Sequence, residues 1–136
     1  MIDLNQIFND SYERISTDPD AFFDEFYSCF FSKSKQIKAL FSHVDMNNQR
    51  IILRESLIHL ISFFSTKIAN DYLLRLADIH KNKIKIDTQM YDIWLEALLE
   101  VVAKYDSKFN EDVEIAWRIT LSPGIEFMKY YKNHSI

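Results

Sequence analysis

Apolar residues recur at helical spacing along almost the whole chain, and this pattern most limits the folds that the sequence can adopt. The 136 residues include one glycine and two prolines, so the chain has little material for the tight turns of an all-β protein. Residues 84–86 alternate between apolar and charged, but three residues are too few to indicate a strand. The sequence therefore predicts one all-α domain over residues 1–136, with seven to eight helices.

Capping residues and prolines set the expected helix boundaries. Asp18 followed by Pro19 is typical of a helix start, and Asp45 is an N-cap candidate for a long apolar helix. Because proline lacks the amide donor, Ser122-Pro123-Gly124 predicts an interruption of the final helix, with a kink there and a shorter helical tail to Tyr131. The expected helices cover about 3–15, 18–32, a short piece ending at 41, 46–67, 70–82, 87–105 and 110–131.

Composition excludes several classes of function. A formal net charge of −4 argues against nucleic acid as a partner, since phosphate binding needs a basic surface. No apolar run approaches the roughly 20 residues of a membrane span, and no signal peptide opens the chain. The single cysteine, Cys29, cannot form an internal disulfide, which fits a reducing compartment. We therefore expect a soluble, cytoplasmic domain that acts without nucleic acid or membrane.

One histidine stands on an apolar helical stripe. His80 follows Leu73, Leu76 and Ala77 at helical spacing, so its imidazole should point inward. A histidine there either finds a hydrogen-bond partner in the core or binds a ligand. Gln49 is a second polar residue that heads an apolar helix face. Two such helices suggest a flat ligand held between them.

The remaining candidate residues receive plainer interpretations. We expect Cys29 to be a small buried hydrophobic residue, His43 to lie on the surface, and His59 to lie on a rim or the surface. No histidines or cysteines adopt zinc-ligand spacing, and a single glycine excludes a glycine-rich phosphate loop. The aromatic share of 15% fits a bulky core or an aromatic-lined cavity.

Taken in chain order, several segments resemble bacterial single-domain globins. The similar segments are Phe26-Tyr27-Ser28-Cys29-Phe30-Phe31 with Ala39-Leu40-Phe41, then Asp45-Met46 with Gln49-Arg50 and Leu53, then Leu76-Ala77-Asp78-Ile79-His80, then Tyr91 with Trp94, and Ala116-Trp117. The resemblance covers nearly the whole chain and implies a globin fold around a haem b pocket.

The resemblance also assigns roles on the proximal side of that pocket. It implies that His80 is the iron ligand, and we expect its second ring nitrogen to donate to a backbone carbonyl near Leu76. It implies that Phe41 lies against the macrocycle. Leu53 and Ile86 would close the pocket with apolar bulk. The predicted cofactor-binding residues also include Leu76, and Tyr91 and Trp94, at spacings similar to those of the family, complete them.

On the distal side the resemblance points to Tyr27 and Gln49. A phenol or amide donor stabilises the partial negative charge of dioxygen, which implies tight binding with slow release. The residues alone leave alternatives open. Tyr27 could be a core tyrosine bonded to a backbone carbonyl, and Gln49 could be a solvated residue at the pocket mouth.

Three functions follow from the resemblance. The first is reversible binding of dioxygen and other diatomic gases, carbon monoxide and nitric oxide among them, for oxygen transport or scavenging. The second is nitric oxide dioxygenase activity, which would require a separate reductase. The third is a gas-sensing or signalling module, favoured by the similarity of Trp117 to Met128 to the last helix of sensor-type globins. The oligomeric state expected is a monomer or a homodimer.

Overall fold

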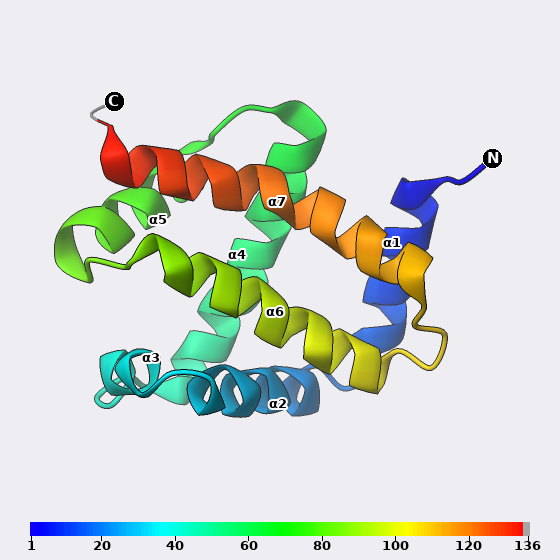
Figure 1. The fold of residues 1–136 in the computed structure, drawn as a ribbon, viewed down its shortest axis with the longest axis horizontal. Helices are drawn as coiled ribbons and strands as arrows, with labels where there is room; N and C mark the ends of the chain where they lie inside the picture. Colours follow the sequence, from blue (N-terminus) through cyan, green and yellow to red (C-terminus); the bar gives the residue numbers. More distant parts are fainter. Residues whose placement is uncertain (135–136) are drawn as a thin grey trace. The chain divides into compact units, whose positions relative to one another are not determined.

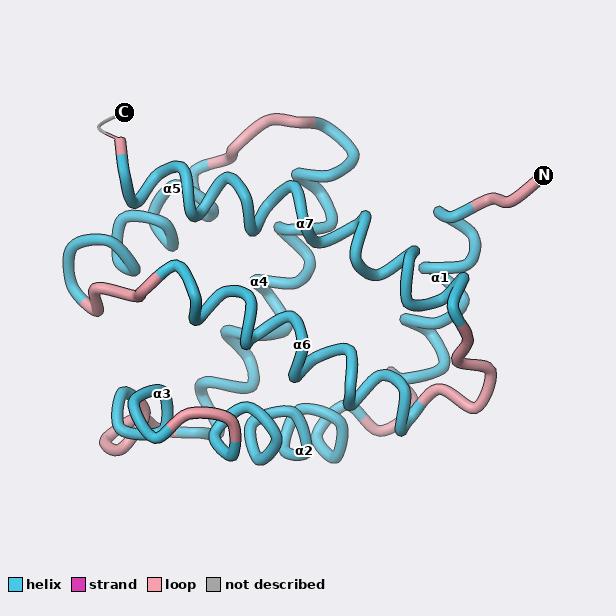
Figure 2. Tube along the Cα trace, in the orientation of Figure 1, coloured by secondary structure: helices cyan, strands magenta, loops and turns pink. Residues whose placement is uncertain are grey.

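The structure is a computed structural model that describes residues 1–134 of the chain. Over this range the secondary structure is helical, with seven α-helices, one π-helix and no strand (Figures 1 and 2). The all-α prediction is therefore confirmed. Within the same residues, no helix is both long and apolar enough to cross a membrane.

The helices begin and end close to the boundaries that the sequence indicates. They are α1 (Leu4–Ile15), α2 (Pro19–Ser32), α3 (Lys35–Leu40), α4 (Met46–Thr66), α5 (Asp71–Asp78), the π-helix η1 (Ile79–Lys83), α6 (Thr88–Tyr105) and α7 (Glu111–Asn133). The Asp18 side chain accepts a hydrogen bond from the Ala21 amide, and Asp45 accepts one from the Asn47 amide. Both predicted N-caps are confirmed, because each satisfies an amide that the first turn leaves unpaired.

The chain divides into two compact units, which are described separately. The first unit comprises Met1–His43 and Ile93–Ile119, and the second comprises Val44–Asp92 and Thr120–Ile136. Helices α6 and α7 each contribute to both units.

The core of the first unit is aromatic. Phe22, Phe26 and Trp117 are each at most 1% exposed. The Trp117 ring lies edge-on to Phe8, with ring centroids 4.7 Å apart. Phe22 packs edge-on against Tyr105 at 5.5 Å. Such edge-to-face pairs add roughly 0.5–1.5 kcal/mol each beyond the burial of their area. The ring density of α2 is thus used in part to pack α2 against α6.

A buried carboxylate ties the first helix to the end of α6. Asp106 is 2% exposed and accepts hydrogen bonds from the Ser11 hydroxyl at 2.6 Å and from Arg14 Nε at 2.5 Å and Nη2 at 2.9 Å. The Lys108 amide donates a further bond at 2.9 Å, and Trp117 Nε1 donates to Ser11 Oγ at 2.9 Å. Burial of a charge is tolerated here because every part of the network has a partner.

In the second unit α7 passes very close to α4 at Gly124. A Cβ added to Gly124 would come within 2.3 Å of Leu60 Cδ2, so the absence of a side chain allows this approach. One turn further along, Phe127 contacts Phe63 of α4, with ring centroids 5.4 Å apart.

The predicted interruption of the final helix at Ser122-Pro123-Gly124, with a separate tail, is wrong, whereas the kink stays a prediction. Helix α7 runs from Glu111 to Asn133 with Pro123 inside it (Figure 1). Proline removes one amide donor and crowds the preceding turn, which costs about 3 kcal/mol in a helix interior. The packing of Gly124 and Phe127 against α4 offsets this cost and keeps the following turns helical.

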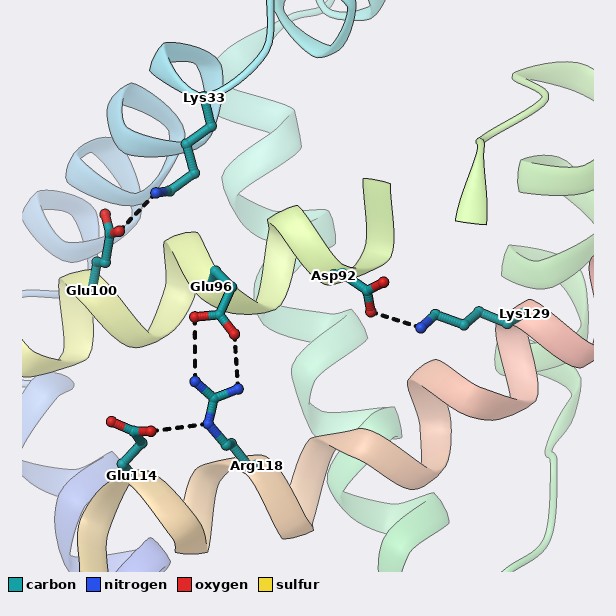
Figure 3. A network of polar contacts seen from close by, with 7 residues as sticks. All are labelled: Lys33, Asp92, Glu96, Glu100, Glu114, Arg118 and Lys129. Atoms are coloured by element: carbon teal, nitrogen blue, oxygen red, sulfur yellow. Dashed lines mark hydrogen bonds and ion pairs between the residues drawn. The ribbon is translucent and has the colours of Figure 1, made fainter. Parts of the chain in front are cut away.

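One face of α6 carries acidic residues four positions apart, and each pairs with a cation (Figure 3). In the first unit, Lys33 pairs with Glu100 at 2.7 Å and Arg118 forms a fork on Glu96 at 2.8 and 3.2 Å. In the second unit, Lys129 pairs with Asp92 at 2.6 Å. These carboxylates are more than half exposed, so each pair contributes about 0–1 kcal/mol.

Candidate functional site

His80 lies in a widened helical turn. Helix α5 ends at Asp78, and the next five residues form the π-helix Ile79–Lys83. The Ile84 amide donates to the Ile79 carbonyl at 3.0 Å, and the Ile86 amide donates to the His80 carbonyl at 2.8 Å. Lys85 adopts a left-handed backbone with a φ of 58°, which is unusual for a residue with a side chain. Widened turns of this kind occur frequently at functional sites.

The His80 imidazole pairs with a tyrosine. His80 Nδ1 lies 3.1 Å from the hydroxyl of Tyr91, in the first turn of α6. Burial lowers the pKa of His80 to about 4, and burial also raises the pKa of Tyr91. Both side chains are therefore neutral at pH 7.

This pairing differs from the expected bond to a backbone carbonyl near Leu76. The Ile79 amide already donates to the carbonyls of Arg75 and Leu76. Tyr91 is 8% exposed, and a buried phenol needs a hydrogen-bond partner. The side-chain pair therefore gives the Tyr91 oxygen and His80 Nδ1 a partner in each other.

The hydrogen bond to Tyr91 leaves the second ring nitrogen of His80 available. The described interactions of residues 1–134 include none that uses His80 Nε2. If Nδ1 carries the proton and donates to the Tyr91 oxygen, Nε2 presents a lone pair, which is the form of imidazole that binds a metal. His80 thus fits an axial ligand of haem iron.

The other predicted residues of the second unit lie on elements that flank His80 in sequence. Gln49 is half-buried in the first turn of α4, and Leu53 is 4% exposed one turn later. Leu76 and Ile86 are half-buried on either side of the π-helix. The Ile86 carbonyl accepts a hydrogen bond from Lys132 Nζ, which ties this segment to α7.

In the first unit the predicted residues form one aromatic cluster. Tyr27 is 5% exposed, and its ring centroid lies 5.9 Å from that of Phe41. Phe26 contacts Tyr27 at 5.0 Å and Trp94 at 6.1 Å. The structure therefore brings Tyr27, Phe41 and Trp94 into one set of contacting rings, linked through Phe26.

The plainer interpretations of other residues have mixed outcomes. His43 is exposed, as expected. Cys29 is half-buried rather than buried, and its thiol donates to Glu100 Oε2 at 3.1 Å. Burial and this bond to the carboxylate raise the pKa of Cys29 to about 11. His59 is half-buried, as expected of a residue on a rim, and its ring stacks on Tyr72.

Two features of the site were missed at the sequence level. The Tyr91 hydroxyl as partner of His80 could have been suspected, because an inward-pointing tyrosine needs a polar partner. The π-helix gave no comparable signal, since the apolar spacing around Leu73 and Ala77 is that of an ordinary α-helix. Among the residues that the structure describes, no three histidine, cysteine or acidic side chains form a cluster that could hold a metal ion.

Comparisons with known proteins identify the family of this chain. A sequence model described as Globin matches residues 24–123. The chain is similar to a solved protein of Pseudomonas aeruginosa described as structurally highly homologous to a human hemoglobin, with 31% identity and a TM-score of 0.88. That similarity covers 96% of this chain and 98% of the Pseudomonas protein. No curated protein matches the chain. The family match and the match over nearly the full length of a solved relative agree with the predicted fold, and the chain therefore belongs to the globin family.

Proposed function

We propose that this globin holds haem b through His80 and reversibly binds dioxygen and other diatomic gases. Membership of the globin family implies haem binding. The observation that carries the proposal is the neutral His80 in the π-helix, with Nδ1 engaged by Tyr91 and Nε2 left for a metal. Haem, when bound, supplies the iron at which a gas ligates.

On the proximal side, Tyr91 orients the imidazole of His80, the proposed iron ligand. The pairing at 3.1 Å fixes the plane of the imidazole, and with Nδ1 as the donor it fixes the tautomer. A neutral phenol is a weaker acceptor than a carboxylate, so His80 remains an imidazole rather than gaining imidazolate character. We also assign the half-buried Leu76 and Ile86, which flank the π-helix in sequence, to the apolar lining of the pocket.

On the distal side we assign Tyr27 and Gln49 as hydrogen-bond donors to dioxygen. The support is their match to the family's positions, together with the burial of Tyr27 and half-burial of Gln49. A neutral hydrogen bond contributes about 0.5–1.5 kcal/mol, which corresponds to at most about a tenfold change in affinity. The family resemblance assigns Phe41, Leu53 and Trp94 to the lining of the haem pocket, and an apolar lining would strengthen such a bond.

The test is an absorption spectrum of the protein supplied with haem, recorded in the ferric state, after reduction with dithionite, and after addition of carbon monoxide. We expect a Soret band that shifts at each step in the native protein. His80→Ala should lose stable ferrous haem coordination. A five-coordinate spectrum unchanged by His80→Ala would refute the proximal assignment, and failure of the native protein to retain haem would refute the proposed function.

The distal assignment has a separate test. Tyr27→Phe keeps the aromatic ring and removes the hydroxyl, so dioxygen release should become several-fold faster, in line with about 1 kcal/mol lost. The matched control is Tyr12→Phe, which removes a hydroxyl from a half-buried tyrosine of α1 that packs on Trp117. An equal off-rate in Tyr27→Phe and the native protein would remove Tyr27 from the mechanism.

A further inference from the structure

A histidine and an asparagine meet where α4 is followed by α5. His59 of α4 lies with its Nδ1 at 2.9 Å from Asn70 Nδ2. The His59 ring stacks on Tyr72, with centroids 4.0 Å apart and planes 12° from parallel. The Tyr72 hydroxyl lies 3.3 Å from Ser56 Oγ and 3.5 Å from the Ile52 carbonyl, so Tyr72 is itself held against α4. His59 is therefore fixed from two sides.

A second hydrogen bond fixes the orientation of the Asn70 side-chain amide. Asn70 is the N-cap of α5, and its Oδ1 accepts a hydrogen bond from the Leu73 amide at 3.0 Å. Nδ2 is then the atom that faces His59, and an amide nitrogen can only donate. His59 Nδ1 must be an acceptor, which requires the neutral ring with its proton on Nε2.

Protonation of His59 removes this acceptor. An imidazolium has a proton on both nitrogens, so Nδ1–H would face the amino group of Asn70. Rotation of the amide would restore a bond to His59, but it would withdraw Oδ1 from the Leu73 amide and uncap α5. The added positive charge would also lie beside the N-terminus of α5, where the helix dipole disfavours cations.

Among residues 1–134, the described interactions of the His59 ring include no carboxylate. Tyr72 is the titratable group that α5 places against the ring, and its stacked face attracts a cation only weakly. Glu55 lies one turn earlier on α4, and Asp71 follows Asn70 in the first turn of α5; the described interactions pair neither carboxylate with His59. From α7, the contacts with this part of α4 involve Gly124 and Phe127, which carry no charge.

We propose that His59 and Asn70 form a pH-sensitive latch on the N-terminus of α5. Neutral His59 holds the amide in the orientation that caps the helix, and protonation of His59 releases the cap. Helix α5 leads directly into the π-helix that carries His80. The consequence for ligation rests on the proposed function, because release of the latch loosens the segment that presents His80.

The experiment measures amide hydrogen exchange by NMR on the full-length protein at about pH 7.5 and about pH 5, which spans the ordinary titration of histidine. After correction for intrinsic rates, protection of the Leu73 amide should fall about fivefold at the lower pH, the effect of losing one N-cap. The internal control is the Val113 amide, which donates to the capping oxygen of another asparagine, Asn110 Oδ1, at 3.0 Å, with no histidine among the described contacts. Its corrected protection should stay constant.

Two variants at position 70 separate the latch from general acid sensitivity. Asn70→Ser keeps a capping oxygen and removes the amino group, so protection of Leu73 should become independent of pH. Asn70→Asp keeps the cap and offers a second oxygen to Nδ1–H of the protonated ring, so protection should rise as the pH falls. His59→Phe retains a stacking ring without an acceptor and should also abolish the pH response.

A second measurement determines directly which ring nitrogen of His59 carries the proton. Nitrogen chemical shifts of the His59 ring at about pH 7.5 should show a proton on Nε2 and none on Nδ1. A proton on Nδ1 would overturn the proposal, as would a Leu73 amide whose pH response is the same in the native protein and in Asn70→Ser. Neither readout involves haem, so failure of the latch and failure of the proposed function are distinguishable.

Discussion

The buried carboxylate of Asp106 allows a quantitative prediction about stability. Asp106→Asn preserves shape but removes the charge and turns one acceptor oxygen into a donor. The bidentate pairing with Arg14 at 2.5 and 2.9 Å is then reduced to a single neutral contact. The Ser11 hydroxyl must also turn away, although it still accepts from Trp117 Nε1. The substitution therefore disturbs two side chains, Arg14 and Ser11, that donate to the same carboxylate.

The size of the effect follows from burial and from the freedom left to Arg14. Breaking a fully buried ion pair costs about 3–5 kcal/mol. The Arg14 side chain is 26% exposed whereas that of Asp106 is fully buried, so water recovers part of the guanidinium's loss. We expect Asp106→Asn to lower the free energy of unfolding by about 2–3 kcal/mol, which is about 7–10 °C in Tm for a chain of this length.

The assay is urea denaturation followed by far-UV circular dichroism at neutral pH, with native protein and variant in the same haem state. Asp92→Asn is the matched control, because it makes the same chemical change in an exposed ion pair with Lys129 (Figure 3). That control should change stability by less than about 0.5–1 kcal/mol. A loss in Asp106→Asn no greater than in Asp92→Asn would refute the reasoning.

The same network predicts the direction of acid sensitivity. Burial alone would raise the pKa of Asp106, but the hydrogen bonds from Arg14, Ser11 and the Lys108 amide outweigh it and hold the pKa below its ordinary value. The lowered pKa stabilises the fold at every pH above the ordinary carboxyl range of about 3.9. This contribution is lost as the pH falls through the folded-state pKa, and it should be absent from Asp106→Asn at all pH values.

Two further predictions concern particular contacts. Since burial and Glu100 raise the pKa of Cys29 to about 11, alkylation of its thiol at about pH 8 should be on the order of a hundredfold slower than for a free cysteine, and Glu100→Gln should recover part of the rate in a maleimide assay. Gly124→Ala should stabilise the protein by about 1 kcal/mol in a Leu60→Ala background but not in the native background, because the new methyl group collides with Leu60 Cδ2. Equal effects in the two backgrounds would show that the collision is relieved by other means.

Local signals in the sequence were sufficient for the helices. Asp18 and Asp45 cap where their side-chain chemistry indicates, and the apolar spacing of α4 and α6 fixes their buried faces. Pro123 is a local signal that misleads. Proline disfavours the interior of a helix, but the contacts of Gly124 and Phe127 with α4 outweigh this effect. Tertiary contacts of this kind cannot be seen in a stretch of sequence.

The sequence pointed to candidate residues for the site, but it did not indicate the hydrogen bonds that these residues make. The stripe of Leu73 and Ala77 pointed to His80, but helical periodicity does not distinguish an α-turn from a π-turn. The partner of His80 lies eleven residues later, across a loop in which Lys85 takes a left-handed backbone. In a residue other than glycine, the surrounding structure must hold such a backbone conformation. The residue type alone therefore does not predict it.

The Asp106 network also fixes the order in which parts of the chain can be secured during synthesis. Ser11 and Arg14 are made early, but their partner Asp106 lies 95 and 92 residues later, and Trp117 lies 106 residues after Ser11. At roughly 5–20 residues per second, α1 waits on the order of 5–20 s for the carboxylate that secures it. Helix α1 is thus synthesised well before the carboxylate that secures it, and its Phe8 and Ile15, each 3% exposed in the folded protein, lack the Asp106 anchor during that interval.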